Sequence, residues 1–138
     1  MGIKYFPYGI EKYQKGIESL RKQIDKDRPE YLCGLHRGGL IPATNLAYLL
    51  RIPLLTFDWR SCRSQETMLE YGNANILMVD EVIWNGWTVG VVSKLLVRKF
   101  PWAVLVYNPK LKMPRVMYHT AVDVERYNDV SFWWRNDI

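Results

Sequence analysis

Two adjacent carboxylates, Asp80 and Glu81, follow the apolar run Ile76–Val79. A short loop with Gly86 and Thr88 comes next, and a helix-like run follows it. In an open α/β sheet, ligands bind beyond the carboxyl ends of the strands. A helix N-terminus preceded by glycine presents backbone N–H groups to a phosphate, while carboxylates beside it can hold ribose hydroxyls or Mg²⁺-bound water. The expected ligand is therefore a sugar phosphate.

A second turn of similar composition lies earlier in the chain, at His36–Gly39. It follows the short apolar run Tyr31–Leu35 and precedes a helix that we expect to begin at Pro42, because proline suits the first turn of a helix. The glycine pair lets the backbone approach an anion closely, and Arg37 adds a planar fork of donors. Either turn alone could be an ordinary strand–helix connection. Because both follow the carboxyl ends of strands, the two together predict one shared ligand site.

Alternating strands and helices must position these turns. Apolar residues at spacings of three and four predict an amphipathic helix from about residue 9 to residue 26. The alternation implies a mainly parallel sheet flanked by helices, so the expected fold class is α/β, a single Rossmann-like domain over residues 1–138. The other predicted elements are strands at 31–35, 54–59, 76–79 and 103–107, helices at 42–50 and 88–100, a polar segment at 60–75, and strand-like pieces at 116–124 and 130–134.

The composition is ordinary for a globular domain. Hydrophobic residues make up 49% of the chain and charged residues 24%, and no apolar run approaches the roughly 18 residues of a membrane span. No signal peptide is apparent, so we expect a cytoplasmic protein and no membrane partner. The net charge of +5 suits a polyanionic ligand, but Lys and Arg are scattered, which argues against nucleic acid. Cys33, inside a predicted strand, is expected to be a buried reduced thiol.

The two turns together resemble motifs of the type I phosphoribosyltransferases, most closely the short xanthine-guanine and hypoxanthine members. The pyrophosphate loop of that family typically reads Ser-Arg-Gly-Gly-Leu-x-Pro, and His36–Pro42 reads His-Arg-Gly-Gly-Leu-Ile-Pro. The family's ribose-phosphate signature has four apolar residues, two acids, two apolar residues and commonly Asp-Thr-Gly-x-Thr, and Ile76–Thr88 follows it with a divergent ending. The resemblance extends across nearly the whole chain. It implies the family's fold, with residues from about 108 to 138 as a small C-terminal hood over the base site.

The resemblance also implies a reaction: Mg²⁺-dependent transfer of the 5-phosphoribosyl group from 5-phosphoribosyl-1-pyrophosphate (PRPP) to a nucleobase, with a purine as the expected acceptor. Asp80 and Glu81 would hold the ribose hydroxyls and, through water, Mg²⁺, and with Arg37 they form the expected catalytic set. Residues 60–71 match a mobile loop that closes over the reacting centre. The expected PRPP-binding residues are His36, Arg37, Gly38 and Gly39 at the pyrophosphate and Asn85, Gly86, Trp87 and Thr88 at the 5′-phosphate.

The expected base site departs from the family's pattern. Trp84 replaces the Asp that purine members place beside N7 of the base as the proposed general acid/base, and an indole cannot accept a proton. Trp84 could stack on a base, block the base site or simply pack. Asn108 stands where purine members carry a base-contacting Lys, for which Lys110 could substitute, and an alignment of the tail puts Asp129 and Val130 at the base. Further aromatic candidates for stacking are Tyr127, Phe132 and Trp133.

Glu81 is a further departure, because the family usually has a second Asp there, one methylene shorter. These departures leave two alternatives to an enzyme open. One is a regulatory protein of the same fold that binds PRPP or a nucleoside monophosphate without transfer chemistry. The other is a basic module that binds nucleic acid. Members of the family usually form dimers or tetramers, so a homo-oligomer is expected as well.

Overall fold

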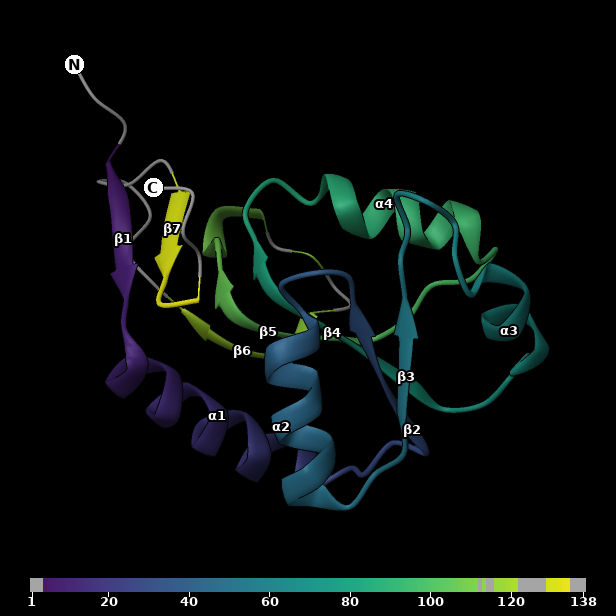
Figure 1. Cartoon of the computed structure of the whole chain (residues 1–138), viewed down its shortest axis with the longest axis horizontal. Coiled ribbons are helices and arrows are strands. Elements are labelled where there is room, and N and C mark those ends of the chain that lie inside the picture. Colours follow the sequence, from purple (N-terminus) through teal and green to yellow (C-terminus); the bar gives the residue numbers. More distant parts are fainter. Residues whose placement is uncertain (1–3, 112, 114–115, 122–128, 135–138) are drawn as a thin grey trace.

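The computed structural model describes residues 4–111, 113, 116–121 and 129–134. Its centre is a five-stranded sheet in which every adjacent pair of strands is parallel (Figure 1). Parallel strands require crossover connections, and helices in these connections cover both faces of the sheet. The predicted α/β fold class is therefore confirmed. In spatial order the strands are β3 (Leu54–Phe57), β2 (Tyr31–Leu35), β4 (Ile76–Ile83), β5 (Trp102–Tyr107) and β6 (Val116–Ala121).

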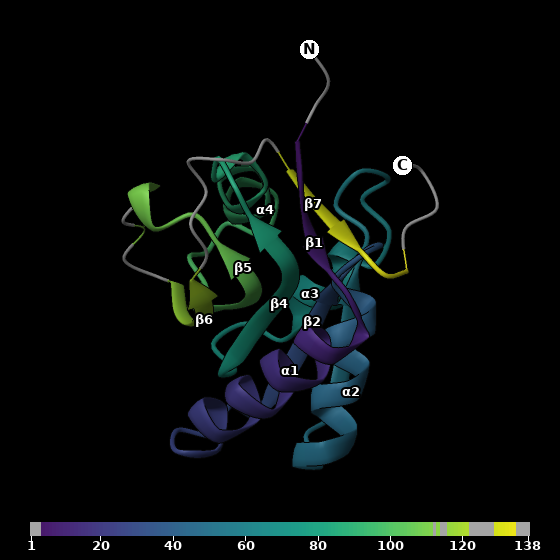
Figure 2. The same ribbon diagram turned by 90° about the vertical axis from the view of Figure 1, so that its left-hand side faces the viewer.

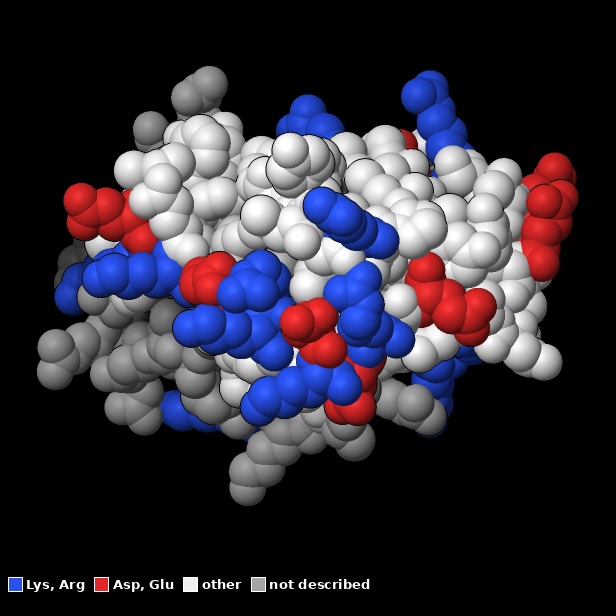
Figure 3. All heavy atoms as spheres, turned by 90° about the horizontal axis from the view of Figure 1, so that it is seen from below, with Lys and Arg blue, Asp and Glu red and all other residues white. Residues whose placement is uncertain are grey.

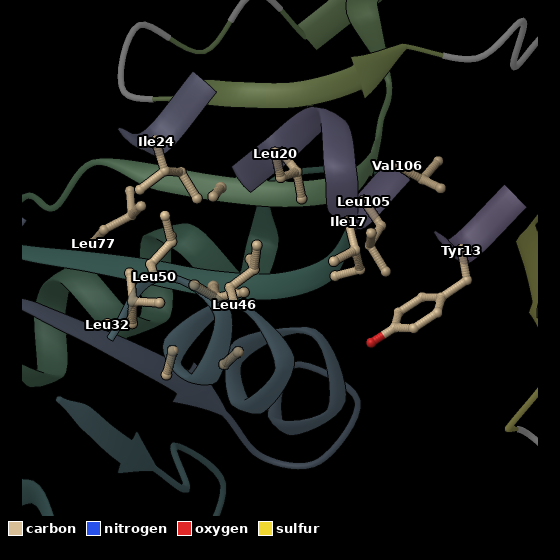
Figure 4. Close-up of a cluster of buried hydrophobic side chains, with 14 of the residues drawn as sticks. Tyr13, Ile17, Leu20, Ile24, Leu32, Leu46, Leu50, Leu77, Leu105 and Val106 are labelled. Carbon is tan, nitrogen blue, oxygen red and sulfur yellow. The ribbon is translucent and has the colours of Figure 1, made fainter. Parts of the chain in front are cut away.

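The helices divide the core into two layers. Helices α1 (Ile10–Asp25) and α2 (Leu40–Leu50) pack on one face of the sheet, whereas α3 (Gln65–Glu70) and α4 (Trp87–Leu95) pack on the other (Figure 2). In the first layer, Tyr13, Ile17, Leu20 and Ile24 form one stripe of α1 and face Leu side chains of α2 and the strands (Figure 4). Each fully buried Leu or Ile contributes about 1.5–3 kcal/mol relative to an exposed one.

Most of the predicted elements are present, but several of their ends are wrong. Helix α2 begins at Leu40 and not at Pro42, and β3 ends at Phe57 and not at residue 59. The strand predicted at 76–79 continues to Ile83, because β5 pairs with β4 as far as Ile83 opposite Tyr107. Asp80 and Glu81 therefore lie within the strand and not after it. The helix predicted at 88–100 begins at Trp87 and ends at Leu95, because Val97 takes a left-handed conformation and the Arg98 N–H donates to the carbonyl of Ser93.

Two elements were not predicted. Helix α3 lies in the segment expected to be only polar loop, and it buries Met68. Strand β1 (Tyr5–Tyr8) pairs in parallel with β7 (Asp129–Phe132), so segments from the two ends of the chain lie side by side in a separate two-stranded sheet (Figure 1). The expected single C-terminal hood is therefore replaced by two separate parts. Strand β6 belongs to the main sheet, and β7 belongs to the small one. A short 3₁₀ turn, Pro109–Leu111, follows β5.

The surface seen from below in Figure 1 carries charges of both signs. Figure 3 shows Lys and Arg interspersed with Asp and Glu on this face. Two ion pairs lie on α1 or just after it, with Arg21 bound to Glu18 at 2.5 Å and Arg28 to Asp25 at 2.9 Å. A mixed face of this kind does not have the basic footprint of a nucleic-acid site. Among the described residues, no helix has the length and apolar character needed to span a membrane.

Both thiols are free, and their surroundings differ. Cys33 is fully buried in β2 with its Sγ 3.8 Å from the Met68 sulfur, and burial raises the pKa of its thiol to about 12. Cys62 is exposed. The expectation of a buried, reduced Cys33 is confirmed.

We expect Ellman's reagent at pH 8 to modify Cys62 quickly in the folded protein and Cys33 only after unfolding in urea, because the thiolate is the reactive form. A Cys62→Ser variant should then show no fast reaction, while Cys33→Ser should keep it. Rapid modification of both thiols in the folded wild-type protein would contradict the placement of β2 in the core.

Candidate functional site

A cavity of about 930 Å³ lies across the carboxyl ends of the parallel strands. The turns after β2 and β3 and the end of β4 form most of its wall, through residues 36–38, 58–60 and 80–82. Ile41, Thr88 and Trp134 complete the wall. The two turns that the sequence singled out therefore meet at one space. This edge is where ligands bind in open α/β sheets.

The turn after β2 is tied to β3 by a hydrogen bond and leads directly into α2. The His36 N–H donates to the Phe57 carbonyl at 3.0 Å, which ties the turn to β3, and the His36–Arg37 peptide is cis. Arg37 is exposed at the cavity wall, and its carbonyl accepts the N–H of Leu40 at 3.1 Å as α2 begins. The guanidinium donors of Arg37 can thus serve an anion in the cavity.

The two glycines of this turn, Gly38 and Gly39, have different surroundings. A Cβ on Gly39 would lie 2.5 Å from the Val79 carbonyl oxygen and 2.8 Å from that of Leu35, so Gly39 lets α2 start against the sheet. Gly39 is buried, and it is not among the described residues that line the cavity. Gly38 does line it, and a Cβ there would collide with the carboxylate of Glu81.

Asp80 and Glu81 both line the cavity although they are consecutive strand residues, whose side chains point to opposite faces. Both reach it because the cavity lies across the end of the sheet. The Asp80 carboxylate accepts the Glu81 N–H at 2.8 Å. Glu81 is only 9% exposed, and its Oε2 accepts the indole N–H of Trp134 at 3.1 Å.

The loop before α4 is a tight turn in which a glycine immediately precedes the helix. Gly86 has a φ of 79°, which favours glycine, and immediately precedes the helix. The Asn85 side-chain oxygen accepts the N–H of Trp87 at 3.0 Å. Thr88, in the first turn of α4, lines the cavity, whereas Asn85, Gly86 and Trp87 are not among its described lining residues. Trp87 is 63% exposed and meets Trp59 edge to face at 5.3 Å.

Three of the residues predicted for the base site, Trp84, Asn108 and Lys110, are linked by hydrogen bonds outside the described cavity wall. The Asn108 side-chain amide donates to the Trp84 carbonyl at 2.9 Å, and the Lys110 N–H donates to the Asn108 side-chain oxygen at 3.1 Å. Trp84 packs against the core layer that contains α1 and α2, and Lys110 is exposed. None of the three belongs to the cavity wall as far as the structure describes it.

The tail supplies a different residue from those predicted. Val130 is fully buried in the core, and the backbone of Asp129 pairs with Tyr5. Phe132 is 1% exposed, Trp133 packs on Tyr13 at 5.8 Å, and Tyr127 lies outside the described residues. Trp134, one position beyond the last candidate, is the tail residue in the described cavity wall.

Sequence reasoning missed Asp58, Trp59 and Trp134. Asp58 and Trp59 directly follow β3, so an acid just beyond the carboxyl end of a strand is a signal that the sequence contains. Asp58 accepts the Ser61 hydroxyl at 2.7 Å, and this hydrogen bond, with the nearby His36, lowers the pKa of its carboxyl. No local signal distinguishes Trp134 from its neighbours.

Solved structures share this architecture. The purine phosphoribosyltransferase from Pyrococcus horikoshii Ot3 matches with a TM-score of 0.72 at 22% identity, over 96% of this chain and 95% of that one. The Helicobacter pylori xanthine-guanine-hypoxanthine phosphoribosyltransferase gives 0.72 at 19% identity, over 99% and 95% of the two chains. This chain has the type I phosphoribosyltransferase fold. A hypothetical protein from Neisseria gonorrhoeae with bound ppGpp matches with a TM-score of 0.71 at 19% identity, over 99% and 93%.

No family model and no curated protein matches the sequence. The resemblance to xanthine-guanine and hypoxanthine members is thus confirmed as a likeness of fold. Within this phosphoribosyltransferase fold, the cavity joins the expected pyrophosphate loop, the acid pair and the start of α4.

The contrast between the two glycines of the phosphoribosyltransferase-like loop can be tested by stability. Gly39→Ala should lower the free energy of unfolding by about 1–3 kcal/mol, because the new methyl group meets backbone atoms. Gly38→Ala should cost less than Gly39→Ala, because its new methyl group meets the end of the Glu81 side chain and not backbone atoms, although Glu81 must then leave its hydrogen bond with Trp134. Urea unfolding measures both.

Gly90→Ala is the matched control, because this exposed position in α4 has nothing within 4 Å of a new Cβ. It should stabilise the protein by up to about 1 kcal/mol. A Gly39→Ala protein as stable as the wild type would show that α2 does not begin against Val79.

Proposed function

We propose that this protein transfers the 5-phosphoribosyl group of PRPP to a nucleobase in a Mg²⁺-dependent reaction. The observation that carries the proposal is the cavity, because it gathers the loop His36–Gly38, the acids Asp80 and Glu81, and Thr88 around one space. A purine is the proposed acceptor, since the solved structures of this fold include a purine and a xanthine-guanine-hypoxanthine phosphoribosyltransferase. The proposed setting is purine salvage in the cytoplasm.

Each wall of the cavity suits one part of PRPP. The Arg37 guanidinium and the backbone of the His36–Gly38 turn would bind the pyrophosphate, which needs several donors in a close approach. Asp80 and Glu81 would accept the ribose hydroxyls. The start of α4, with Thr88 in the wall, would bind the 5′-phosphate through backbone N–H groups and the helix dipole.

In the proposed reaction the bond between C1′ and the pyrophosphate oxygen breaks, and its electron pair leaves with pyrophosphate. A nitrogen of the base forms the new bond to C1′, and its proton passes to water or to the departing pyrophosphate, because Trp84 cannot accept it. Arg37 would stabilise the charge that develops on the departing pyrophosphate, while Asp80 would stabilise the positive charge of an oxocarbenium-like ribose. Residues 60–71 would close over the site and exclude water.

The donor set fits Mg²⁺. Asp80 and Glu81 present hard carboxylate oxygens, and the described residues contain no group of three or more His, Cys, Asp or Glu that could hold a metal by themselves. Mg²⁺ ordinarily binds through one or two carboxylates together with waters and substrate phosphates. When bound here it would neutralise negative charge on the pyrophosphate.

The arrangement at Trp84 favours a second candidate function, a regulatory protein that binds PRPP or a nucleotide without transfer. Trp84 replaces the acid expected beside the base, and Asn108 donates to the Trp84 carbonyl. Neither residue belongs to the described cavity wall. In this case the ribose-phosphate part of the site would be used and the base would not react.

We also propose a homo-oligomer. Large apolar side chains are exposed on the outer side of α2 and at β3, including Tyr48 at 84% and Leu49 at 49%. Such side chains suit the core of an interface.

The experiment that tests the function is nucleotide formation from PRPP and Mg²⁺ with guanine, xanthine, hypoxanthine, adenine and uracil in parallel. We expect product with at least one purine and release of one pyrophosphate per nucleotide. Folded protein that binds a nucleoside monophosphate but makes no product with any base would replace the enzyme with the binding protein.

Asp80→Asn should lower kcat/KM for PRPP by about 100-fold or more, because the amide keeps the shape of the side chain but removes its charge. The matched control is Glu11→Gln, an exposed position on α1 that should leave the rate unchanged. Wild-type activity in Asp80→Asn would remove this carboxylate from the proposed mechanism.

A further inference from the structure

We propose that Trp134 is a positioning residue that fixes the Glu81 carboxylate for the ribose of the substrate. The inference rests on the proposed phosphoribosyl site and deepens it, because it assigns a role to a tail residue that the motifs do not include. The contact that carries it is the hydrogen bond from the Trp134 indole N–H to Glu81 Oε2, at 3.1 Å in the cavity wall.

Glu81 needs such a partner because it is longer than an aspartate and has one more rotatable bond. A free glutamate would lose rotamer entropy each time it bound a ligand. Here the carboxylate is 9% exposed, lies against Gly38 and accepts from Trp134. A donor on one side and backbone on the other hold it in one orientation at the cavity.

Trp134 is itself held in place. Its ring stacks on Phe132 with a centroid distance of 4.6 Å and an interplanar angle of 13°, and it meets Tyr13 edge to face at 5.4 Å. The Tyr13 hydroxyl in turn accepts a hydrogen bond from the side-chain amide of Asn45 and donates one to the Ile41 carbonyl at 3.5 Å. The indole is therefore anchored to β7, α1 and α2, and it can transmit that rigidity to Glu81.

The same contacts relate the chain's departure from the family's pattern to its tail. Asp at position 81 would end one methylene nearer the backbone and could not reach the indole in this geometry. The longer acid and the indole donor are thus one unit. The pair of Glu81 and Trp134 would recognise the ribose of the ligand through its free hydroxyl groups.

The test compares Trp134→Phe with wild type by calorimetric titration of ribose 5-phosphate in the presence of Mg²⁺. Phenylalanine keeps an aromatic ring and removes the N–H donor. We expect the dissociation constant to rise about tenfold, as for a lost hydrogen bond to a charged group. If the enzyme turns over, the KM for PRPP should rise by a similar factor while the KM for the base stays unchanged.

Glu81→Asp tests whether Trp134 acts through Glu81. In this background Trp134→Phe should have little further effect on ribose 5-phosphate binding, so the double-mutant cycle should show coupling. The indole ¹H–¹⁵N resonance that disappears in Trp134→Phe should also shift in Glu81→Asp. Trp102→Phe is the matched control, since among described residues its buried indole N–H has no partner, and ribose 5-phosphate affinity should not change.

The outcomes separate this inference from the proposed function. Unchanged ribose 5-phosphate affinity in Trp134→Phe, or additive effects of the two substitutions, would overturn the positioning role. A wild-type protein that makes no nucleotide but shows the tenfold loss and the coupling would overturn the transferase and support the positioning role. Absence of any binding of ribose 5-phosphate to wild type would overturn both.

Discussion

The site depends on one feature of the sheet, the extension of β4 beyond its neighbour β2. The two strands pair from Tyr31 opposite Ile76 to Gly34 opposite Val79, whereas β5 continues to pair with β4 as far as Ile83. Strand β5 therefore supports the end of β4 on one side, while the other side of β4 lies beside the turn after β2. Asp80 and Glu81 lie in this overhang, which places fixed carboxylates at the cavity. Hydrogen bonds between the strands, rather than a loop, set the position of these two carboxylates.

The regular parts of this fold could be predicted because their signals are local. Tyr31–Leu35 is an apolar run between turn residues, and the stripe of α1 repeats with the helical period. Strand β1 carries no such signal. It has four residues, one of them Pro7, and forms by pairing with β7 at the other end of the chain. The overhang of β4 is likewise a property of its partner β5, which the run Ile76–Val79 alone does not contain.

In the candidate site, too, residues with a local sequence signal could be predicted and residues that act through distant contacts could not. The turn at His36 and the acids at Asp80 have sequence patterns with a chemical meaning, and the structure brings them together. Trp134 has none, because its role comes from a contact with Glu81 across 53 positions of sequence. The base side is the least predictable part. Trp84 and Asn108 bind each other outside the described cavity wall, so their residue types alone do not say what they contact.

We propose that the end of β4 and the start of α4 bind one ribose phosphate between them. A crystal structure with guanosine 5′-monophosphate bound would test this most directly. We predict the ribose hydroxyls within hydrogen-bonding distance of Asp80 and Glu81, and the phosphate at the start of α4 beside Thr88. A nucleotide bound elsewhere, with these carboxylates at a distance from its sugar, would contradict the account.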